Sequence, residues 1–248
     1  MRVARRAPAV GGVLRFRFLF SFVMPTMPSW LAFSLPVMLA YVAGATPFGW
    51  LAGRLRGLDL REHGSGNIGA TNAVRVLGKR VGITVFVLDL LKGWGPVAFA
   101  LWWAATQPAF AGRSLAAQTV PVLAGLGAVL GHTFTFWLGF KGGKGVATST
   151  GIMLGLAPWA LLAAVTAWAL SLKISRYVSL SSIIAGWVLP VAVGLLGWRS
   201  GHWNPPLLTL ALVIAALVTV RHRTNLARIA AGTEPKAGAR RSAAPPQS

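Results

Sequence analysis

Long runs of apolar residues constrain this chain more than any other feature of its sequence. A helix that crosses about 30 Å of hydrocarbon needs roughly 20 mostly apolar residues. Six stretches meet or approach this length, at residues 30–51, 81–105, 115–140, 145–172, 178–198 and 206–220. Only helices and closed barrels satisfy all backbone hydrogen bonds inside a bilayer. The sequence therefore predicts an all-α integral membrane protein whose polytopic membrane domain covers residues 30–232.

The charged residues are few, and most of them are positive. The 248-residue chain contains 24 Lys plus Arg but only 4 Asp plus Glu, a formal net charge of +20. Such a charge favours anionic partners, including lipid headgroups and phosphorylated molecules. The chain has no cysteine, which excludes Cys-ligated zinc and iron–sulfur sites, and four carboxylates are too few for carboxylate-rich metal cages. We therefore expect no metal and no cofactor.

The basic residues also predict the orientation of the helices. They gather at residues 53–80, 141–144, 173–176 and 221–241, whereas the connections at 106–114 and 199–206 carry one Arg each. Because loops rich in Lys and Arg stay in the cytoplasm, the four basic regions are expected there. We interpret these charges as topology signals and membrane-surface attraction, and we expect no nucleic-acid partner.

The stretch 145–172 decides how many times the chain crosses the membrane. A single crossing would place the next basic region on the wrong side. Two short arms that turn at Ala157–Pro158 remove this conflict, because proline cannot continue a helical hydrogen-bond ladder. This reading predicts about seven transmembrane helices, with the N-terminus outside and the C-terminus in the cytoplasm. The alternative is six ordinary helices with one basic loop outside.

The two ends of the chain fall outside this pattern. Residues 1–29 contain five Arg and a short apolar core at 18–24. Two interpretations stay open: a translated basic extension, or a start-site artefact with Met24 or Met27 as the initiator. Residues 233–248 are rich in Pro, Ala and Arg, which predicts a disordered cytoplasmic tail.

The first of three polar stretches spans residues 59–75. It contains three glycines and four short polar side chains: Gly64, Gly66, Gly69, Ser65, Asn67, Thr71 and Asn72. Glycine permits positive φ and leaves backbone N–H groups accessible. Arg75 follows Thr71 by about one helical turn, so both can face one ligand. Amides, hydroxyls and a guanidinium suit a phosphate, although a tight interfacial turn is the alternative.

The second polar stretch spans residues 131–148. Four glycines surround two lysines just before a predicted helix: Gly139, Gly142, Gly143, Gly145, Lys141 and Lys144. A glycine loop at a helix N-terminus directs N–H groups toward an anion, and lysine adds a mobile charge. The alternative is that both lysines anchor helices at the headgroups.

The third polar stretch spans residues 221–236, and a pair of charges lies apart from all three. His222, Asn225 and Arg228 are spaced three apart, so a helix would place them on one broad face. We expect Glu234 to have a structural role by tying this stretch to a basic loop. Asp89 and Lys92, three apart within an apolar stretch, are expected to neutralise each other.

These three stretches carry a resemblance to a known family. They read GSGNIGATNAVR at 64–75, FKGGKGVAT at 140–148 and HRTNLARIAAGTE at 222–234. In this order they resemble the motifs of the bacterial acyl-phosphate:glycerol-3-phosphate acyltransferases, the PlsY family, over residues 30–236. One departure is Thr135, which occupies a position that is often proline in the family.

The resemblance implies a seven-helix enzyme of the bacterial inner membrane with a cytoplasmic active site. It would transfer a fatty acyl group from acyl phosphate to the 1-hydroxyl of glycerol 3-phosphate. The products would be lysophosphatidic acid and phosphate, in the first acylation step of phospholipid biosynthesis. The implied substrate-binding residues are Ser65, Gly66, Asn67, Thr71, Asn72, Arg75, Gly142, Gly143, Lys144, Gly145, His222 and Asn225. Lys144 and Arg75 would stabilise negative charge.

The residues also indicate how such a reaction could proceed. Neither an HxxxxD pair nor a GxSxG nucleophile motif is present. Because an acyl phosphate is already activated, we hypothesise that a substrate phosphate oxygen accepts the proton of the attacking hydroxyl, without a protein general base. The alternative function is a transporter or channel for organic phosphates, in which the same loops form an anion vestibule.

Overall fold

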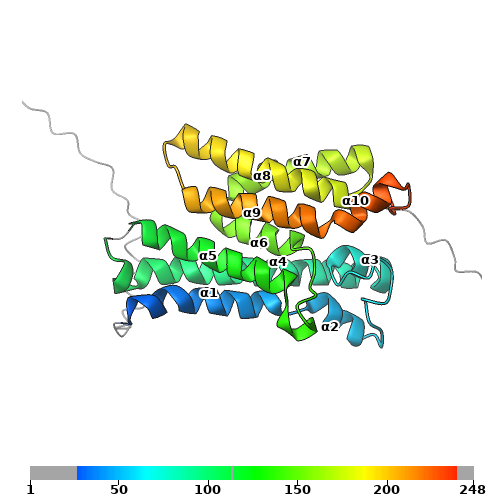
Figure 1. Cartoon of the computed structure of the whole chain (residues 1–248), viewed down its shortest axis with the longest axis horizontal. Helices are drawn as coiled ribbons and strands as arrows, with labels where there is room; N and C mark the ends of the chain where they lie inside the picture. The colour runs from blue at the N-terminus through cyan, green and yellow to red at the C-terminus, as the bar shows by residue number, and fades with distance from the viewer. Residues whose placement is uncertain (1–26, 113, 239–248) are drawn as a thin grey trace, which may run out of the picture.

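The computed structural model describes residues 27–112 and 114–238, and this part of the chain is all-helical, as predicted (Figure 1). The α-helices are α1 (Ser29–Ala45), α2 (Phe48–Arg54), α3 (Ala70–Leu77), α4 (Lys79–Thr106), α5 (Ser114–Thr133), α6 (Val146–Leu156), α7 (Pro158–Ser175), α8 (Val178–Ser200), α9 (Pro205–Arg221) and α10 (Arg223–Ala230). Two 3-10 turns, Pro108–Phe110 and Phe136–Leu138, lie between them. The open question about residues 1–29 falls almost entirely outside the described residues.

The long helices form one elongated bundle (Figure 1). α4 and α5 pack on α1 and on each other, and α6 packs on α4 and α5. α7 packs mainly on α8, and α8 packs on α9. Apolar side chains from α1, α4, α5 and α6 and from α7, α8 and α9 form one continuous core.

Several of these helices match membrane-spanning segments in length and composition. Among the described residues, five stretches are long and apolar enough: Ser29–Arg54, Lys79–Thr106, Leu115–Leu138, Pro158–Ser175 and Val178–Ser200. A sixth results if α9 and α10, which meet at a 51° bend, count as one span. The number of seven crossings and the outside position of the N-terminus stay predictions.

The stretch 145–172 is two helices, as the proline predicts. α6 ends at Leu156, Ala157 leaves the helical conformation, and α7 begins at Pro158. With 11 residues, α6 is about 16 Å long, whereas the 18 residues of α7 span about 27 Å. More than half of α6 is buried, so its neighbours shelter a helix that is too short to cross hydrocarbon alone.

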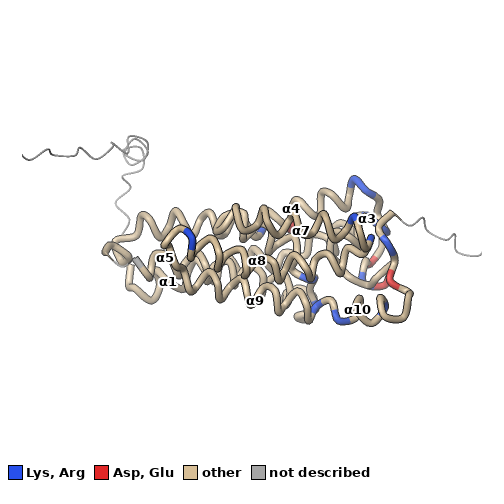
Figure 2. The backbone as a smooth tube through the Cα atoms, turned by 90° about the horizontal axis from the view of Figure 1, so that it is seen from above, with Lys and Arg blue, Asp and Glu red and all other residues tan. Residues whose placement is uncertain are grey.

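The basic regions meet at one end of the bundle, which we call the polar end. It comprises α2, α3, the loop 139–145, the α7–α8 turn, and α10 with the residues that follow it. Figure 2 shows the Lys and Arg positions gathered there, around α3 and α10. Residues 233–238 belong to the polar end: Ala237 N donates to Arg176 O at 2.7 Å. We expected a disordered tail from residue 233, but the part up to 238 packs on the bundle, while 239–248 lie outside the described residues.

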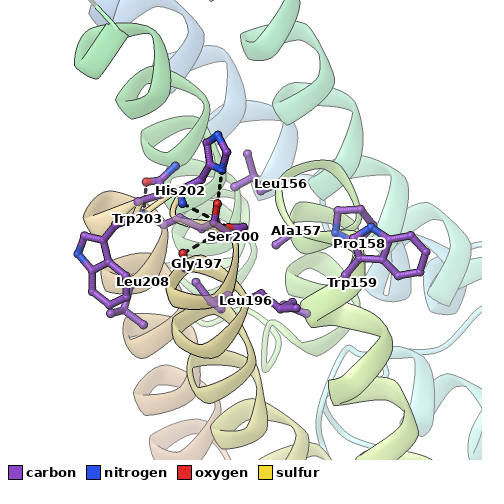
Figure 3. Close-up of a pocket in the computed structure, with 14 residues that line it drawn as sticks. Leu156, Ala157, Pro158, Trp159, Leu196, Gly197, Ser200, His202, Trp203 and Leu208 are labelled. Atoms are coloured by element: carbon purple, nitrogen blue, oxygen red, sulfur yellow. Dashed lines mark hydrogen bonds between the residues drawn. The ribbon is translucent and has the colours of Figure 1, made fainter.

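A cavity of about 330 Å³ lies at the opposite end of the bundle (Figure 3). The α6–α7 turn, the end of α8 and the connection to α9 line it with mostly apolar side chains, among them Ala157, Trp159 and Trp203. It therefore lies away from all three polar stretches. Its lining also shows that the α6–α7 turn reaches the end of the bundle where α8 meets α9.

Glycines allow close contact between the helices. A Cβ at Gly127 or Gly131 would overlap the backbone of α1, and one at Gly151 would overlap the carbonyl of Leu90 in α4. Small residues at such positions let the backbones of membrane helices approach closely. Gly93 makes the reciprocal contact, since its Cβ would overlap the carbonyl of Thr148 in α6.

We predict that Gly93→Ala destabilises the protein because the added methyl group forces α4 and α6 apart. Overpacking of this kind costs about 1–3 kcal/mol. The midpoint of thermal unfolding in detergent should fall. Gly95→Ala is the matched control in the same helix, because no atom lies within 4 Å of a Cβ there. Equal unfolding midpoints for the two variants would contradict the close contact.

Candidate functional site

The three polar stretches, far apart in sequence, contact one another at the polar end. Arg221 Nη2 donates to Gly142 O at 2.8 Å, and Lys144 Nζ donates to Asn225 Oδ1. Arg75 Nη2 donates to Pro235 O at 3.3 Å. The convergence that the sequence hypothesis required is therefore present, and it makes the polar end the candidate site.

Asn72 organises the first stretch from within. Its side chain is buried, and its Nδ2 lies within hydrogen-bond distance of three backbone carbonyls, those of Leu60, His63 and Asn67, at 2.8–3.2 Å. Its Oδ1 accepts from Ser65 N at 2.9 Å. An amide offers two N–H donors and one carbonyl oxygen. Asn72 therefore holds the loop in shape, which differs from the ligand contact that we expected.

The loop that Asn72 holds leads directly into α3. Gly64 and Gly66 have φ values of 64° and 68°, a region that favours glycine. Asn67 Oδ1 accepts from Gly69 N at 2.8 Å, just before the helix begins. Thr71 and Arg75 then lie one turn apart on α3, with Thr71 exposed and Arg75 half-buried. Both remain accessible to a ligand.

The loop start is fixed by an ion-pair cluster around Asp59. Its carboxylate accepts from Arg61 Nη2 at 2.7 Å and from Arg54 Nη2 at 3.3 Å. The hydrogen bonds from Arg61 outweigh burial and hold the pKa of Asp59 well below its usual range. Both arginines therefore pair with Asp59, whose single negative charge offsets one of their two positive charges.

The glycine–lysine loop corrects one expectation. Gly142 N donates to Thr133 O at 3.0 Å, and Gly143 N donates to His132 O at 3.1 Å. These two amides therefore stabilise the loop. We had expected them to point toward an anion, and they do not. The glycines are needed because a Cβ at either position would overlap the end of α5. Glycine serves close approach here, which the sequence alone does not distinguish from ligand binding.

Lys144 lies directly before the N-terminus of α6, where the sequence places it, and its role in anion binding stays a prediction. Gly145, with φ 81°, is the N-cap of α6 and accepts from Ser149 N at 2.8 Å. In residues 27–112 and 114–238, no partner faces the amides of Gly145 and Val146. Burial, together with the charges of Arg228, Arg75 and Arg221, outweighs the opposing effect of Glu234 and lowers the pKa of Lys144 to about 8.

The third stretch places His222 and Asn225 at the bend between α9 and α10. Both side chains are buried. The ring of His222 has its Nδ1 2.7 Å from the carbonyl oxygen of Val218. Because a carbonyl only accepts, Nδ1 carries a proton there. We expected His222 and Asn225 to share one helix face with Arg228. At His222 and Asn225 this face is buried against the bundle.

Glu234 accepts hydrogen bonds from its own stretch and from α8, and its structural role stays a prediction. Its Oε1 accepts from Asn225 Nδ2 at 2.6 Å and from Ser179 Oγ at 2.9 Å, and its Oε2 accepts from Arg228 Nε at 2.8 Å. Burial raises the pKa of Glu234, but these three hydrogen bonds outweigh it, so the pKa lies below its usual value.

Sequence reasoning missed two contributors to the site. Arg221 braces the glycine–lysine loop by donating to the carbonyls of Gly142 and Gly143. Its only signal was its place directly before His222 in a basic run. Ser179 is one of several serines in an apolar stretch, and no spacing sets it apart.

Asp89 and Lys92 form the expected pair close to the glycine–lysine loop. Their Oδ1 and Nζ atoms lie 2.7 Å apart, and Lys92 Nζ also donates to Thr46 O at 2.6 Å, in the break between α1 and α2. His132, whose carbonyl accepts from Gly143, lies with Nδ1 3.8 Å from the same Asp89 oxygen. Over the described residues, no three His, Asp or Glu side chains gather as metal ligands.

Comparison with known proteins identifies the family. The family model described as "Glycerol-3-phosphate acyltransferase" matches residues 34–232. The glycerol-3-phosphate acyltransferase of Geobacter sulfurreducens is 44% identical over 196 residues, which cover 79% of this chain and 93% of the relative. That of Trichlorobacter lovleyi is 43% identical over 197 residues, with the same coverage of both chains.

Two solved structures of PlsY, an integral membrane glycerol 3-phosphate acyltransferase, also resemble this protein. The glycerol 3-phosphate form has a TM-score of 0.70 at 39% identity and covers 83% of this chain and 95% of that one. The lysophosphatidic acid form has a TM-score of 0.66 at 39% identity and covers 82% and 94%. The chain therefore belongs to the glycerol-3-phosphate acyltransferase family and is, like PlsY, a multi-pass integral membrane protein.

Proposed function

We propose that this protein transfers a fatty acyl group from acyl phosphate to the 1-hydroxyl of glycerol 3-phosphate and releases lysophosphatidic acid and phosphate. Its family supports acyl transfer to glycerol 3-phosphate. The two PlsY forms, with glycerol 3-phosphate and with lysophosphatidic acid, support the acceptor and the product. The acyl phosphate donor rests on the motif resemblance.

The observation that carries this proposal is that, in the part of the chain that the structure describes, Lys144 and Arg75 are not paired with a carboxylate. Within the described residues, each donates only to a neutral oxygen, Asn225 Oδ1 for Lys144 and Pro235 O for Arg75. By contrast, Arg228 is paired with Glu234. A phosphate bound by both side chains would add charge–charge attraction to hydrogen bonding, which a neutral oxygen does not offer.

The chemistry needs positioning and charge stabilisation. The 1-hydroxyl oxygen attacks the acyl carbonyl carbon, the new ester C–O bond forms, and the bond between that carbon and the phosphate oxygen breaks. The hydroxyl proton passes to a phosphate oxygen of a bound substrate. Lys144 and Arg75 stabilise the negative charge on the carbonyl oxygen and the leaving phosphate.

The remaining site residues bind and orient the substrates. Thr71 offers a hydroxyl one turn from Arg75 on α3, and Ser65 offers another on the loop before this helix. The amide of Gly145, which has no hydrogen-bond partner among the described residues, offers a further donor. At the α9–α10 bend, His222 contacts substrate through the ring nitrogen that does not face Val218, and Asn225 acts by holding Lys144. Asn72 shapes the loop that carries Ser65. Ser65 orients a substrate and does not attack, so an acyl-enzyme isolated on Ser65 would contradict this mechanism.

We place the site at the cytoplasmic face of the bacterial inner membrane. The four basic regions lie at the polar end, and positively charged loops remain on the cytoplasmic side. Glycerol 3-phosphate then reaches the site from water. With the acyl carbonyl beside Lys144, the hydrocarbon chain would follow the apolar helix α6 into the bilayer.

The purified protein should form lysophosphatidic acid from acyl phosphate and labelled glycerol 3-phosphate, without added divalent metal. Chromatography of the labelled lipid measures the product. Parallel reactions with acyl-CoA or acyl carrier protein test the donor and should give no product. If reconstituted vesicles take up labelled glycerol 3-phosphate without forming lipid, the protein is a carrier and the proposal fails.

Lys144→Ala should lower kcat/KM by at least about 100-fold, the scale of removing one charge-stabilising donor from an active site. The protein should still insert into the membrane, because Lys144 contributes no core packing. Lys141→Ala is the matched control, since Lys141 is exposed in the same loop. Full activity in Lys144→Ala would refute the role given to this residue.

The pH dependence of kcat/KM should report the ionisation of Lys144. Burial and neighbouring positive charge lower its pKa to about 8 in the free protein. Lysine loses its charge as the pH rises through its pKa, so kcat/KM should fall above about pH 8. Lys144→Arg, which stays charged, should remove this alkaline decline, even if its overall activity is lower. An unchanged decline would assign it to another group.

A further inference from the structure

Ser179 lies in the first turn of α8, outside all three polar stretches, yet its hydroxyl contacts the site. Its Oγ donates to Glu234 Oε1 at 2.9 Å, and both side chains are buried. The same oxygen accepts from Asn225 Nδ2 at 2.6 Å. Arg228 Nε holds the other carboxylate oxygen at 2.8 Å. Three donors from two helices therefore fix the carboxylate of Glu234.

The fixed carboxylate decides which way the amide of Asn225 faces. A carboxylate only accepts hydrogen bonds, so it selects the Nδ2 end of the amide. The Oδ1 end is then left facing Lys144 Nζ, to which it is hydrogen-bonded. The reverse orientation would set an N–H group against an ammonium group, and neither could accept.

We infer that Ser179 is a positioning residue that holds Lys144 in place through Glu234 and Asn225. The effect of Ser179 on the position and ionisation of Lys144 does not depend on which reaction the protein catalyses. The effect on turnover rests on the proposed function. Ser179 touches no reacting atom and acts only through this chain of hydrogen bonds.

Contacts between the α7–α8 turn and the residues after Glu234 hold Ser179 close to Glu234. Ala237 N donates to Arg176 O at 2.7 Å, and Arg176 Nη2 donates to Ala237 O at 3.3 Å. Lys236 Nζ lies 5.6 Å from the ring centre of Tyr177, within the range of a cation–π contact. The residues after Glu234 are therefore tied to the residues before Ser179.

The charges around Lys144 make its ionisation a sensitive readout. Glu234 favours its charged form, whereas burial and Arg228 of α10, Arg75 of α3 and Arg221 of α9 oppose it. His222 lies at the bend beside them. If the carboxylate is released and the Asn225 amide turns, Lys144 loses an acceptor. Its pKa should then fall below about 8.

Competitive labelling of the wild-type protein and its Ser179 variants with acetic anhydride over a range of pH tests this inference. Mass spectrometry of the Lys144 peptide gives the pH midpoint, and exposed Lys141 serves as the internal reference for reagent. Ser179→Ala should lower the midpoint by about half a unit to one unit, the shift that corresponds to the net contribution of a typical hydrogen bond. Ser179→Thr, which keeps the hydroxyl, should retain the wild-type midpoint.

Ser181→Ala is the matched control for loss of a buried hydroxyl in α8. Ser181 Oγ donates to Tyr177 O at 2.9 Å, a local bond that does not reach Glu234. This variant should keep the wild-type midpoint. If Ser179→Ala folds poorly, Ser179→Cys, with a weaker donor of similar size, should lower the midpoint in the same direction. A wild-type midpoint in Ser179→Ala, or equal shifts in the Thr and Ala variants, would overturn the inference.

Turnover separates this inference from the proposed function. With acyl phosphate and glycerol 3-phosphate, Ser179→Ala should lower kcat about ten-fold, which corresponds to about 1.4 kcal/mol. Its unfolding midpoint should match that of Ser181→Ala. If the wild-type protein forms no lysophosphatidic acid, the proposed function fails, but the labelling result still decides the role of Ser179.

Discussion

Two positive side chains, Lys144 and Arg75, meet at the polar end with only neutral oxygens as hydrogen-bond partners among the described residues. Two charges of the same sign in a partly buried place repel each other, and an anion between them relieves that repulsion. On the proposed function, this repulsion contributes to the affinity for phosphate. The nearby carboxylate of Glu234 is instead hydrogen-bonded to Ser179, Asn225 and Arg228.

The scarcity of acidic residues is part of this arrangement. Asp59 binds Arg54 and Arg61, Asp89 binds Lys92, and Glu234 binds Arg228. Glu62, the fourth carboxylate, is exposed on the loop that leads to α3. Each buried carboxylate is therefore engaged by a cation outside the pair that we assign to substrate charge. A further carboxylate near Lys144 would compete directly with a phosphate.

Much of this structure could be predicted from the sequence. Proline explains the turn at Ala157–Pro158, and the spacing of Gly127 and Gly131 explains the contact with α1. The hydrogen-bond partners of individual backbone amides and side-chain hydroxyls could not be predicted. Glycine at 142 is compatible with an exposed amide or with close approach, and only the position of the end of α5 decides between them. Likewise, the hydroxyl of Ser179 matters only because a distant carboxylate folds against it.

The unequal lengths of α6 and α7 set the depth of the reaction. Both helices start from the same turn, and α7 extends further toward α10 (Figure 1). For helices side by side, a difference of seven residues sets the first residue of α6, which follows Lys144 closely, roughly 10 Å below the end of α7. The headgroup layer on each side of a bilayer is only about 5–8 Å thick. On the proposed function, this difference would place the ammonium near the boundary between headgroups and hydrocarbon, where an acyl phosphate could react without leaving its leaflet.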